Sequence, residues 1–347
     1  MNIAATDLHL NQKLISPNAL KLEFKLSENF KQQIDQSREV IRNILSGQDK
    51  RLMVIVGPCS VHDPEMVLQY ASCLKVLQER VADSIYIVMR TYIEKPRTTI
   101  GWKGYLYDPH LDGSANVNFG LESSRNLFLK IIELGLPIAG EILNPMMAMY
   151  FDDLFSWGAI GARTSESQIH REIASYLKFP IGFKNTTDGS IQVAMDAIAS
   201  ASNPHDFIGI DQDGQTSLLR SHGNIATHLI LRGSHAGPNY AYQDVRRIKE
   251  NSQQNLSGLV IDCSHGNSAK NHLNQKAVLK TVIEERHLTE VKGVMLESFM
   301  VEGKQIISHP LVIGQSITDA CLGWEDTSRL LLEAHTLLKQ NRMATVI

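Results

Sequence analysis

Eight short apolar runs in this chain each end in, or directly precede, a residue that can take part in chemistry. Together these residues provide a thiol, an imidazole, two carboxylates and four cations. In chain order they are Cys59, Arg90, Glu141, Arg163, Lys184, Arg232, His265 and Glu297. One charged residue after one apolar run is most simply the end of a strand. Because the pattern recurs in eight runs, we expect these side chains to meet at one site.

The stretches between most of these runs have the length and the amphipathic spacing of helices. Alternating strands and helices predict a parallel sheet with crossover helices. Eight such units predict an α/β fold of the (β/α)8 TIM-barrel class. In that fold the active site forms at the C-terminal ends of the strands, where the eight residues would stand.

Two segments fall outside the eight units. Residues 1–50 are a polar N-terminal arm, in which a helix is predicted between a capping Ser27 and Gly47. The arm could close the bottom of the barrel, mediate oligomerisation or help to form a regulatory site. Residues 51–347 are expected to form the catalytic barrel. Within it, an Asp213-Gly214 turn between two short strand candidates predicts an inserted β-hairpin near 207–220.

Composition limits the classes of function. The chain has 347 residues, of which 43% are hydrophobic and 20% charged, enough for a barrel of about 250 residues with extensions. The formal net charge of -3 does not indicate binding to nucleic acid or to an anionic membrane. No apolar run approaches the roughly 20 residues that span a bilayer, and no signal peptide is recognisable. The expected location is cytoplasmic, with the four cysteines reduced.

The densest group of chemically active residues is the loop at 90–104, after the second apolar run. It combines cations with hydroxyl groups and contains a proline that stiffens it. The residues are Arg90, Lys95, Pro96, Arg97 and Thr98. Guanidinium groups bind phosphate with two parallel hydrogen bonds, and hydroxyls can satisfy the remaining oxygens. With Arg163, Lys184 and Arg232 at other strand ends, the loop predicts a pocket for two small phosphorylated substrates, or for a phosphate and a carboxylate.

A second set of residues has the chemistry of metal ligands. It consists of Cys59, His265, Glu297 and Asp319. Sulfur, nitrogen and carboxylate donors together suit one divalent ion such as Mn, Fe, Co or Zn better than Mg, which prefers oxygen ligands. The four residues lack the close spacing of a metal-binding motif. A buried cysteine and a hydrogen-bonded core histidine are therefore the structural alternatives.

A series of motifs connects these residues with a known family. In order they read GPCSVHDP, MRTYIEKPRTTIGWKG, GARTSESQIHRE, GFKN before TDG, LRG, DCSHGNS, ES before VEG, and SITDACLGWE. The series resembles 3-deoxy-D-arabino-heptulosonate 7-phosphate (DAHP) synthase of the feedback-regulated type I alpha group. The resemblance implies a metal-dependent, aldol-like condensation of phosphoenolpyruvate with erythrose 4-phosphate and water. That reaction is the first step of the shikimate pathway to the aromatic amino acids.

The resemblance also implies a role for each residue. The metal ligands would be Cys59, His265, Glu297 and Asp319, the last of which also faces substrate. Phosphoenolpyruvate would contact Arg90, Lys95, Arg163, Lys184 and Arg232, with Glu141 acting through water. Erythrose 4-phosphate would contact Pro96, Arg97 and Thr98. The residues expected to be catalytic are Lys95, Glu141, Arg163 and Lys184. Lys95, Glu141 and a water on the metal are the candidates for moving protons.

Regulation is implied by the same resemblance. An aromatic amino acid effector would bind a pocket lined by Asn144, Met149, Ala174, Leu177, Lys178, Phe207 and Gly209. Gly209 stands where phenylalanine-sensitive members tend to have serine, which favours tyrosine as the inhibitor. Met149 departs from the family pattern, and a hairpin that only packs between subunits is the alternative. A homodimer or a homotetramer is expected.

Other departures from the family pattern concern loops. Thr186 replaces a usual glycine, which would strain a backbone that needs a positive φ. Phe299 and the pair Ser234-His235 replace other common residues. None of these changes removes a predicted ligand or cation.

Three other functions are open to the chain. A sibling synthase uses arabinose 5-phosphate, but its usual signature lacks KPRTT. A Schiff-base aldolase could use Lys184, but would not need the four predicted metal ligands. A non-catalytic, effector-binding paralogue would not need the intact sets of ligands and cations.

Overall fold

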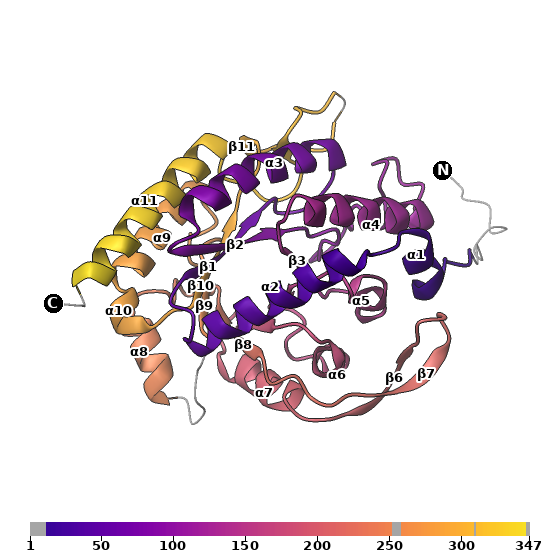
Figure 1. Cartoon of the computed structure of the whole chain (residues 1–347), viewed down its shortest axis with the longest axis horizontal. Helices are drawn as coiled ribbons and strands as arrows, with labels where there is room; N and C mark the ends of the chain where they lie inside the picture. Colours follow the sequence, from indigo (N-terminus) through magenta and orange to yellow (C-terminus); the bar gives the residue numbers. More distant parts are fainter. Residues whose placement is uncertain (1–11, 252–257, 309, 345–347) are drawn as a thin grey trace.

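The computed structural model of the chain describes residues 12–251, 258–308 and 310–344 (Figure 1). The strands are β1 (Leu52–Gly57), β2 (Ile85–Arg90), β3 (Ile138–Glu141), β4 (Trp157–Ile160), β5 (Ile181–Lys184), β6 (Asp206–Ile210), β7 (Thr216–Arg220), β8 (Thr227–Leu231), β9 (Val260–Asp262), β10 (Gly293–Glu297), β11 (Val301–Lys304) and β12 (Gln315–Ser316). The α-helices are α1 (Pro17–Glu23), α2 (Glu28–Ser46), α3 (Pro64–Val81), α4 (Val117–Glu133), α5 (Pro145–Phe151), α6 (Gln168–Tyr176), α7 (Gln192–Ala201), α8 (Tyr242–Asn251), α9 (Gln275–Glu284), α10 (Arg286–Thr289) and α11 (Trp324–Ala344). A short 3-10 helix, η1 (His272–Asn274), precedes α9.

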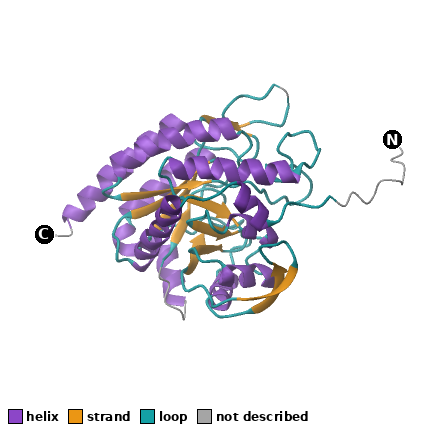
Figure 2. Cartoon of the chain, turned by 45° about the vertical axis from the view of Figure 1, so that its right-hand side comes forward, coloured by secondary structure: helices purple, strands orange, loops and turns teal. Residues whose placement is uncertain are grey.

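The central feature is a closed barrel of eight parallel strands in the order β1-β10-β9-β8-β5-β4-β3-β2. The strands lie inside a layer of helices (Figure 2). Their near-continuous apolar sequences fit this position, because a strand of a parallel barrel is buried on both faces. The predicted (β/α)8 TIM barrel is therefore confirmed. No helix among the described residues is long and apolar enough to cross a membrane.

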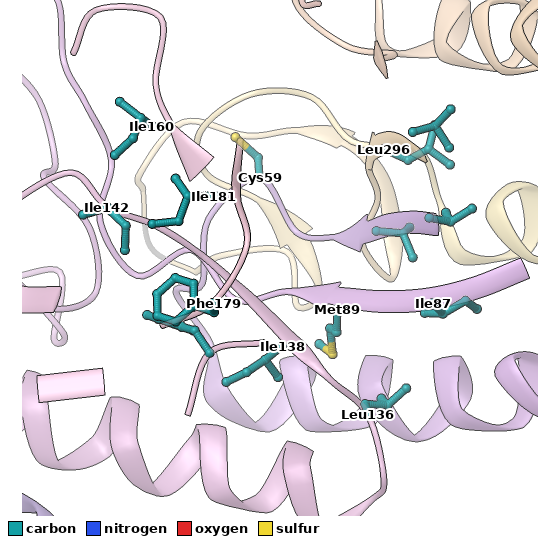
Figure 3. Packing of buried hydrophobic residues seen from close by; sticks show 14 of the residues in the cluster. Cys59, Ile87, Met89, Leu136, Ile138, Ile142, Ile160, Phe179, Ile181 and Leu296 are labelled. Atoms are coloured by element: carbon teal, nitrogen blue, oxygen red, sulfur yellow. The ribbon is translucent and has the colours of Figure 1, made fainter. Parts of the chain in front are cut away.

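Each barrel strand has one face toward the interior of the barrel and one toward the helices, because successive side chains alternate. The interior residues form a hydrophobic cluster of their own, consisting of Met53, Ile55, Val88, Ala139, Trp157, Ala159, Ile230, Val260 and Met295 with three residues of α2. The outward residues pack against the helices in a larger cluster, as Figure 3 shows for Ile87 and Met89 on β2. The same alternation determines which side chains at the strand ends point into the barrel.

Helix α2 lies across the N-terminal end of the barrel. Its residues Ile41, Ile44 and Leu45 join the interior cluster. Arg38 donates to the carbonyl of Phe155, before β4, at 3.0 Å, and Arg42 donates to Lys178 O, before β5, at 2.6 Å. Of the roles left open for the arm, the structure shows that it closes the bottom of the barrel.

The ends of α2 are those predicted. Ser27 Oγ accepts from Phe30 N at 3.3 Å, and Gly47 ends the helix with a φ of 81°. The single-helix prediction for the arm was incomplete, because α1 forms about two further turns before α2. Its signal was the pair Ser16-Pro17, a capping serine followed by proline at the first helical position.

The predicted hairpin is present as β6 and β7, paired antiparallel from Asp206 and Arg220 to Ile210 and Thr216. Gly214 allows the turn with a φ of 78°. The tip of the hairpin contacts α1, where Asn18 N donates to Gln212 O at 2.7 Å. The N-terminal arm and the hairpin, separate in the sequence, are therefore packed together.

Candidate active site at the carboxyl end of the barrel

The eight residues singled out in the sequence all lie at one end of the barrel. Four are the last residues of their strands, namely Arg90, Glu141, Lys184 and Glu297. The other four, Cys59, Arg163, Arg232 and His265, follow β1, β4, β8 and β9 by one to three residues. Because all eight strands are parallel, their carboxyl ends form a single rim.

Strand alternation directs several of these side chains into the barrel. Arg90 lies two residues after Val88, and Glu297 two residues after Met295, both members of the interior cluster. Gly57 at the end of β1 makes room for Arg90, because a β-carbon on Gly57 would lie 2.8 Å from the Arg90 carbonyl oxygen. The charged ends of the strands thus continue the inward face of an apolar core.

Three of the predicted metal ligands converge. One ligand atom each of Cys59, Glu297 and Asp319 lies within 4.8 Å of the other two. The Lys95 ammonium lies among them, with Nζ 2.8 Å from Cys59 Sγ and 2.7 Å from Asp319 Oδ2. A positive charge thus already lies against these donors. A thiol and two carboxylates around one point fit a borderline divalent cation.

Asp319 reaches this group although its segment lies far from β10 in the sequence. Leu322 N donates to the carbonyl of Glu297 at 2.9 Å, and Phe299 N donates to Leu322 O at 2.9 Å. The backbones of Cys321 and Gly303 pair as an isolated antiparallel β-bridge. Backbone pairing with the chain that leaves β10 therefore holds Asp319 beside the other donors.

The fourth predicted ligand, His265, does not belong to the group whose ligand atoms all lie within 4.8 Å of one another, although its charge acts on Asp319 and helps to lower the pKa of that carboxyl. Its backbone has a φ of 56°, and its Nδ1 lies 3.0 Å from Asp262 Oδ2. Asp262 was not singled out in the sequence. Its signal was its place two residues after Val260, on the inward face of β9.

Glu297 is held from three directions. Ser264 Oγ donates to its Oε2 at 2.9 Å, and Arg90 Nη2 lies 3.4 Å from its Oε1. The fully buried Gln275 accepts from Glu297 N at 2.8 Å and donates to Glu297 O at 3.1 Å. Neither Ser264 nor Gln275 was predicted, because neither residue type indicates such a role without the fold.

Arg90 is buried, with its guanidinium carbon 4.0 Å from the centre of the Tyr92 ring. Its contacts with Pro58 O, Cys59 O and Glu297 Oε1 are each 3.4 Å long, and Nη1 faces the weakly accepting Met295 Sδ. These contacts are weak for a guanidinium. Arg90 is therefore oriented by stacking and keeps donors for a stronger anionic acceptor.

The other predicted cations lie around the same rim. Lys184 Nζ lies 2.7 Å from Asp262 Oδ2, and both side chains are nearly or fully buried. Arg163 is exposed and donates to Thr98 Oγ1 at 3.1 Å, which connects β4 with the loop that carries the exposed Arg97. Asn185 accepts from Arg232 N at 2.9 Å and so holds the end of β8.

Electrostatics follow from this arrangement. Burial, and after it the Glu297 carboxylate, raise the pKa of the Cys59 thiol to about 12. Burial alone would raise the pKa values of Asp319 and Asp262. The neighbouring ammonium groups of Lys95 and Lys184 outweigh it, and both pKa values are lowered. Both carboxylates are thus charged, and metal binding at Cys59 has to displace a proton.

Comparisons with known proteins agree with the motif series. Residues 23–332 match the sequence profile of the DAHP synthetase I family. The chain belongs to this family. It is 49% identical over 341 residues to the tyrosine-sensitive phospho-2-dehydro-3-deoxyheptonate aldolase of Salmonella typhimurium, covering 96% of this chain and 95% of the relative. It is 46% identical to the phenylalanine-sensitive enzyme of Escherichia coli, covering 99% and 100%.

Solved structures of the family agree with the fold. The aldolase of Francisella tularensis SCHU S4 superposes with a TM-score of 0.92 at 43% identity, covering 94% of this chain and 97% of that one. The enzyme of Thermotoga maritima, at 18% identity and a TM-score of 0.57, shares the fold.

The residues expected to bind a family effector fall into two places. Helices α5 and α6 and strand β6 contact one another. Met149, Ala174, Leu177 and Phe207 are buried among these elements, whereas Gly209 is half-buried and Lys178, beyond the end of α6, is exposed. Asn144 lies instead at the start of α5, where its Nδ2 donates to Tyr107 OH at 3.1 Å.

The loop departures from the family pattern are accommodated. Thr186 does not have a positive φ, so the expected strain does not arise. Its Oγ1 donates to Asp188 Oδ1, and its backbone N donates to the Ser190 carbonyl at 3.2 Å. Phe299 is buried and lies against the rings of His62 and Tyr70.

The loop at 90–104 is anchored by a buried acid that the sequence did not single out. Glu94, beside Lys95, is 5% exposed, and it accepts from Tyr107 OH at 3.0 Å and from Asn144 N at 3.4 Å. Burial raises the pKa of its carboxyl to about 7, although the two hydrogen bonds by themselves would lower it. The loop and the start of α5 thus share one titratable group.

This gives a prediction for stability against pH. The folded protein keeps the Glu94 proton up to about pH 7, whereas the unfolded chain releases it near pH 4.5. The free energy of unfolding should therefore fall between these pH values. Glu94→Gln cannot ionise at this position. The free energy of unfolding of the variant, measured in urea relative to that of wild type, should therefore rise by up to roughly 3 kcal/mol as the pH is raised from 4.5 to 8. Glu133→Gln, at an exposed position on α4, is the control, and its difference from wild type should not change with pH. The same pH-independent difference for Glu94→Gln would contradict the prediction.

Proposed function

We propose that this chain condenses phosphoenolpyruvate with erythrose 4-phosphate and water to DAHP and phosphate, with one divalent metal held by Cys59, Glu297, Asp319 and His265. The observation that carries the proposal is the convergence of Cys59, Glu297 and Asp319 inside a rim of cations. The sulfur donor favours Mn, Fe, Co or Zn over Mg. Cations around a metal site suit two anionic substrates that must react with each other.

The cations bind and align the two anions. Arg90, Lys184 and Arg232 would hold the phosphate and carboxylate of phosphoenolpyruvate, with Arg163 and Lys95 completing the site. Arg97 and Thr98, joined to Arg163 through the 3.1 Å contact with Thr98, would hold the phosphate of erythrose 4-phosphate beside Pro96. Fixing both reactants next to each other converts an encounter in solution into a reaction within one complex.

The reaction joins carbon 3 of phosphoenolpyruvate to the aldehyde carbon of the sugar. Water adds at carbon 2, and phosphate then leaves. A bound divalent metal supplies Lewis-acid polarisation of the aldehyde oxygen. Lys95, whose Nζ lies 2.8 Å from Cys59 Sγ, would give a proton to the new alkoxide, and Glu141 at the end of β3 would hold the attacking water.

One assay tests this function. Loss of phosphoenolpyruvate is followed with erythrose 4-phosphate, before and after chelation, and with Mn, Fe, Co and Zn added back. We expect activity that disappears with the chelator and returns with at least one of these ions. Full activity after exhaustive chelation would contradict the metal site, and consumption of arabinose 5-phosphate in preference would contradict the sugar assignment.

The Schiff-base alternative is disfavoured by the environment of Lys184. A Schiff base forms from the neutral amine, whereas Asp262 lies 2.7 Å from Nζ and stabilises the ammonium. Borohydride should therefore leave the enzyme active in the presence of substrate.

Tyrosine is proposed as the feedback inhibitor. The reasons are the glycine at position 209 and the resemblance to relatives described as tyrosine-sensitive. A β-carbon on Gly209 would lie 2.8 Å from Leu219 Cδ1, so a larger residue would displace the Leu219 side chain in the region of the expected pocket. Initial rates should fall more with tyrosine than with phenylalanine or tryptophan. Gly209→Ser should weaken inhibition by tyrosine, and insensitivity of the wild type to tyrosine would refute the proposal.

We also propose that the chain forms a homodimer or homotetramer. Ile208 and Leu218, which are 77% and 71% exposed, lie directly opposite each other on β6 and β7. Such an apolar pair on the outer face of a hairpin is suited to contact a second copy. Light scattering coupled to gel filtration should give a mass of two or four chains.

A further inference from the structure

Asp262 lies between the two halves of the proposed site and has no role in the proposal so far. It is the last residue of β9 and is completely buried. Its Oδ2 lies 2.7 Å from Lys184 Nζ and 3.0 Å from His265 Nδ1. One carboxylate oxygen therefore contacts a cation proposed for phosphoenolpyruvate and a histidine proposed for the metal.

The position of Asp262 is set by the barrel. Its register partner on β10 is Met295, two residues before Glu297. Its own Oδ1 accepts from Ser264 N at 3.0 Å, and Asn267 Nδ2 donates to its carbonyl at 2.8 Å. The carboxylate is thus fixed at both its backbone and its second oxygen, which leaves Oδ2 for Lys184 and His265.

The chemistry of a carboxylate decides which nitrogen of His265 carries the proton. The 3.0 Å between His265 Nδ1 and Asp262 Oδ2 is within hydrogen-bonding distance, but the angle at Nδ1 is too bent for a hydrogen bond, and the buried Nδ1 has no other partner among the described residues. An ionised carboxylate only accepts hydrogen bonds, so a small turn of the ring that completes this contact requires the proton to be on Nδ1. In a neutral imidazole the other nitrogen, Nε2, then has the lone pair. Partners of this kind commonly orient metal-binding histidines, and their loss typically weakens metal affinity 10- to 100-fold.

We propose that Asp262 is a positioning residue for both halves of the site. It fixes His265 in the tautomer with Nε2 free for the metal, and it holds the Lys184 ammonium at the phosphoenolpyruvate end. The inference rests on the proposed function, because that function supplies the roles of His265 and Lys184. It predicts that one substitution weakens two affinities that belong to different residues.

The first test compares Asp262→Asn with wild type in direct binding experiments without turnover. Mn²⁺ affinity is measured by the electron paramagnetic resonance signal of the free ion, and phosphoenolpyruvate affinity by calorimetry. We expect Mn²⁺ to bind about 10- to 100-fold more weakly, with weaker phosphoenolpyruvate binding in the same variant. Asp262→Asn that is folded and keeps both affinities within twofold would overturn the inference.

Asp153→Asn is the matched control. Asp153 forms a two-pronged pair with the fully buried Arg125, at 2.9 and 2.7 Å, and belongs to the segment after α5 at the opposite end of β4. The control removes the charge of an aspartate from a buried ion pair outside the site. It should lower the melting temperature without changing either affinity.

The second test needs no folded variant of Asp262. Nitrogen chemical shifts of the 13 histidines are recorded for the metal-free wild type, and His265 is assigned by the signal missing in His265→Gln. We expect Nδ1 to be protonated and Nε2 not. The opposite tautomer would overturn the inference. A wild type that binds no Mn²⁺ would instead refute the proposed function, and the tautomer would still decide the role of Asp262.

Discussion

Replacing Cys59 with alanine is expected to abolish metal binding and to lower kcat/KM by about 10³-fold, since a catalytic metal contributes several kcal/mol. Cys59 Sγ is buried between Glu297 and Asp319, in the group whose ligand atoms lie within 4.8 Å of one another. Its removal takes the sulfur donor from the set and leaves the two carboxylates facing Lys95. The protein should stay folded, because alanine fits the space of cysteine without adding a polar group.

Metal content and steady-state rates measure this effect. Cys73→Ser is the control, because Cys73 is a free, half-buried cysteine on α3, outside the site. It should keep full metal content and activity. Cys59→Ala protein with one bound metal per chain and near-normal kcat would show that the sulfur is not a ligand.

Replacing Arg90 with lysine is expected to lower kcat/KM for phosphoenolpyruvate by about 10²- to 10³-fold although the charge is kept. Lysine lacks the planar fork that binds an anion through two parallel hydrogen bonds. It would also lose the stacking on Tyr92, where the guanidinium carbon lies 4.0 Å from the ring centre. Glu297, 3.4 Å from Arg90, would lose a partner that orients it toward Cys59 and Asp319.

The split between KM and kcat tests the reason. We expect KM for phosphoenolpyruvate to rise more than KM for erythrose 4-phosphate, because Arg90 is assigned to the first substrate. Arg246→Lys on α8, at an exposed pair with Glu250, serves as the control and should be indistinguishable from wild type. Equal rises of both KM values would assign Arg90 to the general electrostatics of the site and not to one substrate.

The architecture could be predicted because its signals are local. Apolar runs such as VIVG and IYIVMR, separated by amphipathic stretches, indicate strands and helices by residues that are neighbours in the chain. The caps of α2 at Ser27 and Gly47 were equally local, and the structure has them at those positions. Helix α1 was missed because seven residues are too few to show a clear amphipathic period.

The site was predicted in part. Residues with distinctive chemistry, such as Cys59 and Arg90, stood out at the ends of runs, and the motif series extended the set to Asp319 and Lys95. Gln275 and Tyr92 were missed because a glutamine in a helix and a tyrosine near a strand end are ordinary. Their contacts with the Glu297 backbone and with Arg90 exist only after the barrel has closed.

The sequence by itself determined the barrel and the end of it at which the candidate site lies. The reason is that the two-residue period of a strand and the common direction of parallel strands follow from local order. Only the tertiary structure decided which groups touch. Lys184 and Asp262 are 78 residues apart, and Cys59 and Asp319 are 260 apart. The register of β5, β8, β9 and β10 and the return of the chain after β12 bring them within hydrogen-bonding distance, and no local pattern encodes that register.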